Sequence, residues 1–145
     1  MAHWTTSTTA NATPDQVLEV LTDPDAIRDW APIPFAVEQL DGRKLETGSH
    51  ARVRGGIAGM SMGFDIEVLA ADEAGLELTA QGPIGIDVRY DLAVADGGSE
   101  VTASVSLQGG GGITGRLVKK ATEALLSAGA LDGAAGRIAR VAEAA

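Results

Sequence analysis

The C-terminal stretch from Ile113 to Val141 carries apolar residues at steps of three and four, the spacing of one helical face. The stretch contains no proline and follows a run of glycines at 109–112. At 1.5 Å per residue it would form a helix roughly 40 Å long. Gly129, Gly133 and Gly136 each cost about 1 kcal/mol relative to alanine in a helix, so they indicate either a close approach to another element or a break near Gly129. The expected apolar stripe comprises Leu117, Ala121, Ala124, Ala128, Leu131, Ala135 and Ile138.

Between Phe35 and Leu107 the pattern changes to an alternation of apolar and polar residues, which is typical of antiparallel strands with one covered face. Turn sequences such as Asp41-Gly42, Gly82-Pro83 and Asp96-Gly97-Gly98 separate the alternating segments. The expected strands are 35–40, 48–54, 60–68, 76–80, 86–94 and 101–107. Their covered face would carry Met60, Met62, Phe64, Ile66, Val68, Leu76, Leu78, Ile86, Val88, Tyr90, Leu92, Val101, Val105 and Leu107.

The N-terminal part begins with a threonine-rich segment, His3 to Ala12, that favours a strand. Thr13 and Gln16 then form a capping box around a proline at the first helical position. Asp23-Pro24 ends this helix and starts a second short one, 24–30. The order of elements predicts an α+β fold in which a long terminal helix covers the apolar face of a sheet.

This order, and the segment 13–24 (TPDQVLEVLTDP) followed by Ile27, Trp30 and Pro32, resembles the START/birch-pollen-allergen superfamily, the SRPBCC group. Leu18 stands where that superfamily usually has an aromatic residue. The resemblance implies a helix-grip fold over 1–145: a curved antiparallel sheet of about seven strands wrapped around a long C-terminal helix, with two short helices after the first strand. It also implies an apolar tunnel that binds lipids, polyketides, sterols or hormones. The glycines at 109–115 before an alanine-rich helix are similar, more weakly, to the carbon monoxide dehydrogenase branch of that superfamily.

The composition narrows the possible partners. A formal net charge of −9 argues against nucleic acid and against steady residence on an anionic membrane. Zero cysteines exclude disulfides and thiolate chemistry. We find no signal peptide and no apolar stretch long enough for a membrane span, and therefore expect a cytoplasmic monomer or homodimer without a metal or cofactor.

The covered face contains one polar tip, the Tyr90 hydroxyl, and no Asp, Glu, His, Lys or Arg. A carrier or sensor of an apolar molecule, lipid-like or polyketide-like, is therefore the leading hypothesis. The expected ligand contacts are Trp30, Met60, Met62, Phe64, Ile66, Leu78, Val88, Tyr90, Leu92, Leu117, Ala124 and Ala128. Both methionines and Tyr90 could equally be core side chains, and Trp30 could be a gate or plain packing.

Two alternatives stay open. A polyketide aromatase/cyclase would need an inward acid, base or Arg, for which Arg28, Asp29 and Arg116 are the candidates. An accessory protein acting on a partner enzyme would follow from the likeness to the carbon monoxide dehydrogenase branch.

Other polar clusters carry less. His50, Arg52 and Arg54 share one strand face, where we expect ion pairs with Asp65, Glu67, Asp87 or Asp91 rather than a metal site. The glycine-rich segments 55–59 and 109–112 lack the phosphate-loop pattern and are predicted to be a hairpin tip and a hinge.

Overall fold

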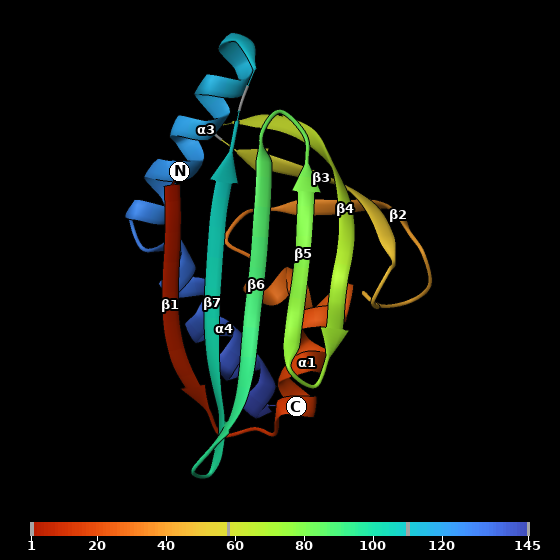
Figure 1. The fold of residues 1–145 in the computed structure, drawn as a ribbon, viewed down its shortest axis with the longest axis vertical. Coiled ribbons are helices and arrows are strands. Elements are labelled where there is room, and N and C mark those ends of the chain that lie inside the picture. The colour runs from red at the N-terminus through yellow and green to blue at the C-terminus, as the bar shows by residue number, and fades with distance from the viewer. Residues whose placement is uncertain (1, 58, 110, 145) are drawn as a thin grey trace.

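The computed structural model describes residues 2–57, 59–109 and 111–144 and shows seven strands in one antiparallel sheet with four helices on its concave side (Figure 1). The sheet order is β1-β7-β6-β5-β4-β3-β2, so every strand from β2 to β7 pairs with its neighbour in sequence and β1 closes the series beside β7. The strands are β1 (Ala2–Ala10), β2 (Phe35–Leu40), β3 (His50–Ile57), β4 (Met60–Asp72), β5 (Gly75–Gln81), β6 (Gly85–Ala95) and β7 (Gly98–Gln108). The helices are α1 (Pro14–Thr22), α2 (Pro24–Trp30), α3 (Gly112–Ser127) and α4 (Ala130–Ala144).

The two short helices begin where their caps require. The Thr13 side chain accepts a hydrogen bond from the Gln16 amide at 3.2 Å, and the Gln16 side chain accepts one from the Thr13 amide at 2.9 Å. Asp23 ends α1 and caps α2 through the Asp25 amide. The predicted capping box and the predicted second helix, 24–30, are therefore confirmed.

Two irregularities bend the sheet. The register shifts between Val37 and Gln39 on β2 and between Val68 and Ala70 on β4, and such bulges add local twist. The second shift also turns Leu69 outward, where it is exposed. The predicted helix-grip architecture is confirmed: β2 and β3 curl around the helices, while α4 packs against β1, β7 and the α1–α2 pair (Figure 1).

The C-terminal helix is not continuous. It breaks at Ala128–Gly129, where Gly129 has a φ of +95°, a conformation that glycine adopts without strain. Of the two explanations for the glycines, the break near Gly129 is the one the structure shows. The break also changes which face of each helix is buried: α4 buries Leu131, Ala135 and Ile138 of the predicted stripe.

The stripe was wrong for α3. This helix buries Gly115, Val118 and Thr122, and it leaves Leu117 exposed. Ala124 and Ala128 are exposed as well. The periodicity located an apolar face, but α3 turns a neighbouring face to the core.

The predicted hairpin tip at 55–59 is shorter than expected. Gly55, Gly56 and Ile57 continue β3, because the Gly56 amide donates to the Pro34 carbonyl at 3.0 Å and the strand packs on the segment before β2. Ala58, in the predicted tip, and Gly110, in the predicted hinge, lie outside the described residues.

Candidate functional site

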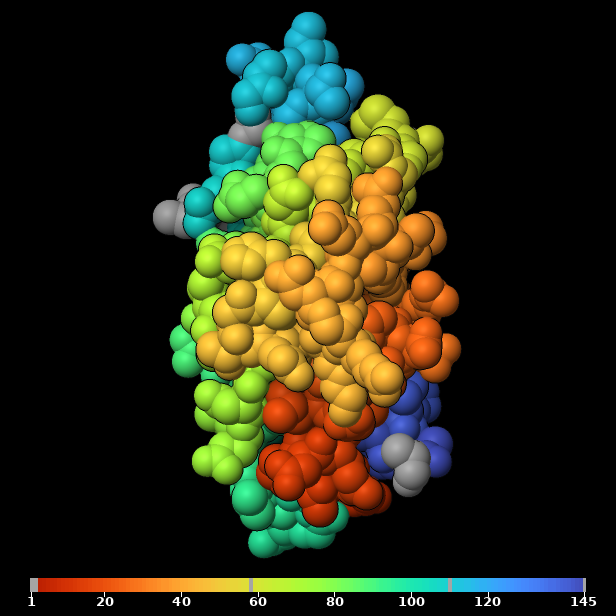
Figure 2. Space-filling model, turned by 90° about the vertical axis from the view of Figure 1, so that its right-hand side faces the viewer, coloured from red at the N-terminus to blue at the C-terminus, as the bar shows by residue number. Residues whose placement is uncertain are grey.

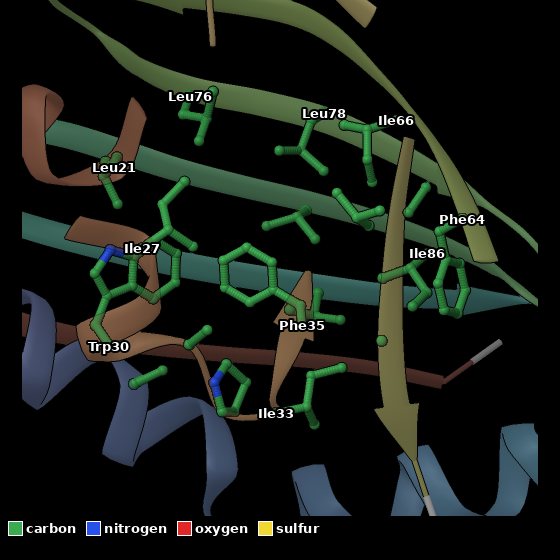
Figure 3. A pocket seen from close by; sticks show the side chains of 18 of the residues that line it. Leu21, Ile27, Trp30, Ile33, Phe35, Phe64, Ile66, Leu76, Leu78 and Ile86 are labelled. Atoms are coloured by element: carbon green, nitrogen blue, oxygen red, sulfur yellow. The ribbon is translucent and has the colours of Figure 1, made fainter. Parts of the chain in front are cut away.

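A cavity of about 290 Å³ lies between the concave face of the sheet and the helices (Figure 3). Strands β3 to β7 form one wall, α2 and the segment from Ala31 to Leu45 a second, and the α3–α4 junction a third. Figure 2 shows the segment from α2 to β3, in orange and yellow, spread over the middle of one face of the molecule. The wall residues are Leu21, Pro24, Ile27, Trp30, Ala31, Pro32, Ile33, Phe35, Val37, Leu40, Leu45, Ala51, Val53, Gly55, Ile57, Phe64, Ile66, Leu76, Leu78, Ala80, Ile86, Val88, Tyr90, Val105, Thr122, Leu125, Leu126, Ala130, Leu131 and Ala134.

Three side chains in this wall carry polar atoms, and two of them are satisfied internally. The Trp30 indole donates to the Val20 carbonyl at 2.9 Å, and the Thr122 hydroxyl donates to the Val118 carbonyl at 2.8 Å. No Asp, Glu, His, Lys or Arg belongs to the wall among the described residues. The interior is therefore an apolar environment with little capacity for acid–base chemistry.

Tyr90 is the third polar side chain. Its ring meets Trp30 edge-on, with the centroids 5.7 Å apart and the planes at 77°. The residue is buried, and within the described part of the chain its hydroxyl has no hydrogen-bond partner. No side-chain oxygen or nitrogen of the described residues is both fully enclosed and unpartnered, so the Tyr90 oxygen borders open space, and the residue lines the cavity. Burial raises the pKa of Tyr90 above its ordinary value, so the hydroxyl is neutral and can donate a proton in a hydrogen bond.

Half of the expected ligand contacts line this cavity. Trp30, Phe64, Ile66, Leu78, Val88 and Tyr90 are wall residues, and their part in binding stays a prediction. Trp30 is buried and held by its hydrogen bond, so it packs as a fixed part of the wall. Wall residues that reach the molecular surface, such as Pro32 and Leu125, mark where the cavity opens.

The other expected contacts lie elsewhere. Met62 and Leu92 are buried on the covered face but pack into the core beyond the cavity. Met60, beside the β3–β4 turn, is 37% exposed, because the end of the hairpin projects past the helices. On α3, Leu117, Ala124 and Ala128 point away from the cavity because the buried face is the one with Val118 and Thr122.

The sequence interpretation missed the wall between α2 and β3. Ile33, Phe35 and Val37 alternate with Pro34 and Ala36, a period-two signal that starts before β2 and that marks the inward side. Nothing in the local pattern shows that this segment folds over the distant strands β5 and β6.

The polar clusters outside the cavity behave as solvated surface. Arg52 lies 2.6 Å from Asp65 and 3.7 Å from Glu38, and His50 lies 3.8 Å from Glu67. The predicted pairing with Asp65 and Glu67 is confirmed, and Glu38 is an additional partner. Across the described ranges, no group of three or more His, Cys, Asp or Glu side chains could hold a metal ion.

The candidates for acid–base chemistry lie outside the cavity. Arg28, Asp29 and Arg116 are exposed and are not part of its wall. None of the helices within residues 2–57, 59–109 and 111–144 is long and apolar enough to cross a membrane.

Known proteins share this fold over almost the whole chain. The model of a family described as polyketide cyclase/dehydrase and lipid transport matches residues 1–143. No curated protein matches the chain. A solved protein from Chromobacterium violaceum is 14% identical, with 97% of this chain and 96% of that chain covered and a TM-score of 0.70. Ara h 8.0201 is 18% identical, with 94% and 97% covered and a TM-score of 0.59.

DynU16, a protein of the dynemicin biosynthetic locus, is also similar in structure. It is 25% identical with a TM-score of 0.60, and 95% of this chain covers 46% of that chain. The present chain thus spans less than half the length of DynU16. The likenesses to the Chromobacterium violaceum protein and to Ara h 8.0201 bear on the fold alone.

Proposed function

Because the chain belongs to the polyketide cyclase/dehydrase and lipid transport family, we propose that it binds an apolar small molecule, lipid-like or polyketide-like, in the cavity under the sheet. The observation that carries this proposal is the wall itself: about 290 Å³ enclosed almost wholly by aliphatic and aromatic side chains. This volume lies close to the lower end of the range for small-molecule sites, roughly 300–1,000 Å³.

The energetics favour an occupied cavity. A dry void costs about 24 cal/mol per Å³, so a cavity of 290 Å³ left empty would cost up to about 7 kcal/mol. That is comparable with the whole stability of a typical domain, about 5–15 kcal/mol. Water that enters at the mouth lowers this cost but finds few hydrogen-bonding partners on an apolar wall. An apolar ligand relieves the cost without that loss.

Tyr90 narrows the class of ligand. A hydroxyl that borders an apolar cavity without a partner is costly, and a ligand that brings one hydrogen-bond acceptor would satisfy it. The ligand we propose is therefore mostly hydrocarbon or aromatic, with a carbonyl, hydroxyl or ether oxygen at the position that reaches Tyr90. Trp30 would contribute the aromatic surface beside this polar contact, since the two rings already touch edge-on.

The same hydroxyl supports a second candidate, cyclisation or dehydration of a polyketide-like chain. The neutral phenol could donate a hydrogen bond to a carbonyl oxygen and stabilise the negative charge that forms there during an aldol-type closure. The cavity would supply the folded conformation of the chain. With no base in the described wall, binding and positioning remain the better supported role.

Native mass spectrometry of the purified protein, followed by organic extraction, tests the leading proposal. We expect an extractable apolar molecule bound one to one by the wild type and lost from Val88→Trp, which fills the cavity. Val94→Trp is the matched control, because Val94 lies on the same strand and is 83% exposed. Equal occupancy of the two variants would refute the cavity as the binding site.

A Tyr90→Phe variant separates the two candidates. A carrier should keep bound ligand and lose a modest part of its affinity, whereas a cyclase should bind its linear substrate and lose turnover.

A further inference from the structure

Helix α3 carries a row of apolar side chains that has no partner in the described structure. Ile113, Leu117, Ala121 and Leu125 follow one another at intervals of four residues, so they form a ridge along one side of the helix. Ile113 is 78% exposed, Leu117 56% and Leu125 38%. We call these four residues the α3 ridge. Exposure of large apolar side chains in a row, rather than singly, marks a surface made for contact with another apolar phase.

The charge on α3 is opposite to that of the chain as a whole. Arg116, Lys119 and Lys120 lie on this helix with Glu123 as its one acidic residue, in a protein of net charge −9. On the sheet, Arg52, Arg54 and Arg89 are each paired with carboxylates. The three cations of α3 form no ion pair with any described side chain. By helical spacing they stand beside the ridge, on the flank away from Leu125.

The α3 ridge leads to the cavity. Its last member, Leu125, is both exposed and part of the cavity wall. Its first member, Ile113, lies on the opening turn of α3, which projects beyond the sheet at one end of the long axis (Figures 1 and 2). An apolar path thus runs along the helix from the projecting end to the mouth of the cavity.

We propose that the α3 ridge docks this protein transiently on the surface of an anionic lipid membrane, with the mouth of the cavity toward the bilayer. Apolar side chains at the interface with neighbouring Lys and Arg are the features that hold amphipathic helices on such surfaces. The function of this contact is to let the ligand pass between bilayer and cavity without crossing water, and to that extent it rests on the proposed function.

A second copy of the chain fits the α3 ridge less well. A symmetric dimer through α3 would place the cations of one copy close to the same cations of its partner, and like charges in an interface oppose association. The negative charge of the rest of the molecule keeps the docking weak, because only α3 is attracted to the membrane.

Flotation with phosphatidylcholine vesicles, with and without phosphatidylglycerol, tests the docking surface directly. We expect the wild type to bind anionic vesicles at least tenfold more tightly than neutral ones at low salt, and to lose this preference at high salt. Leu117→Glu should weaken binding at least tenfold, and so should the combined changes of Arg116, Lys119 and Lys120 to Gln. Val94→Glu is the control, because it puts the same charge at an exposed apolar position on β6 and should bind as the wild type does.

Ligand content measured without vesicles distinguishes this proposal from the proposed function. If Leu117→Glu and Val94→Glu bind vesicles equally, or if binding does not depend on lipid charge, docking by α3 is wrong, whatever the ligand content. If size-exclusion chromatography with light scattering shows a dimer that Leu117→Glu alone disrupts, the α3 ridge is an interface between copies and the membrane proposal falls. If the protein carries no ligand yet docks as expected, the docking stands and the proposed function fails.

Discussion

Replacing Val88 by Trp distinguishes a true cavity from an ordinary packed interior. Val88 lies at the middle of β6, opposite Leu78 on β5 and Val105 on β7, and all three side chains line the cavity. An indole at this position would project from the floor of the sheet into the empty space. Val101 on β7 is the matched position, because it is fully buried and is not part of the cavity wall.

The two substitutions should have opposite effects on stability. In a packed core, a larger side chain forces its neighbours out of their rotamers and costs about 1–3 kcal/mol, and Val101→Trp should cost at least that much. At Val88 the added atoms replace void, and each Å³ filled removes about 24 cal/mol of cavity cost. The ligand-free Val88→Trp protein should therefore be as stable as the ligand-free wild type, or more stable by about 1 kcal/mol.

Urea denaturation of both variants after removal of bound ligand measures this difference. The midpoint of unfolding should fall clearly for Val101→Trp and should stay level or rise for Val88→Trp, with unchanged m-values. The ligand should be lost from Val88→Trp only. If Val88→Trp is destabilised as much as Val101→Trp, the interior is filled by side chains and the argument for a binding cavity is wrong.

Three further predictions concern single residues. Tyr90→Phe should change stability by less than about 0.5 kcal/mol at pH 7, because the hydroxyl makes no internal hydrogen bond, and should lower ligand affinity by about twofold to tenfold in a titration. Burial raises the pKa of Tyr90 above its ordinary value of 10.0, so its contribution to stability is present below that pH and is lost as the pH rises further; alkaline unfolding, followed together with the phenolate absorbance of this single tyrosine, should be delayed in Tyr90→Phe. Gly129→Ala should cost about 1–2 kcal/mol in urea denaturation through the positive φ alone, since an added Cβ meets nothing within 4 Å, and a cost near zero would show that the α3–α4 break is flexible. Thr13→Ala removes one half of the capping box and should cost about 1 kcal/mol, while Thr13→Ser should restore most of it.

The sequence alone determined the elements whose signals are local. Alternation over two residues defined the strands from β2 to β7, and the pair Thr13 and Gln16 defined the start of α1. Glycines at 129, 133 and 136 signalled a possible interruption, and Gly129 provides it. The covered face of the sheet, with Tyr90 as its polar tip, also followed from alternation, because neighbouring side chains in a strand point to opposite faces.

Only the tertiary structure decided which apolar faces became a cavity wall and which became surface. Leu117 and Val118 are adjacent and both apolar, yet one is exposed and the other fully buried, because the orientation of α3 depends on where the chain turns at Gly129 and on what β3 and α4 present. The outer wall from Pro32 to Leu40 likewise depends on β2 curling over strands far away in sequence. Periodicity indicates that a face is apolar, but the packing of distant segments decides whether that face meets the core, a cavity or solvent.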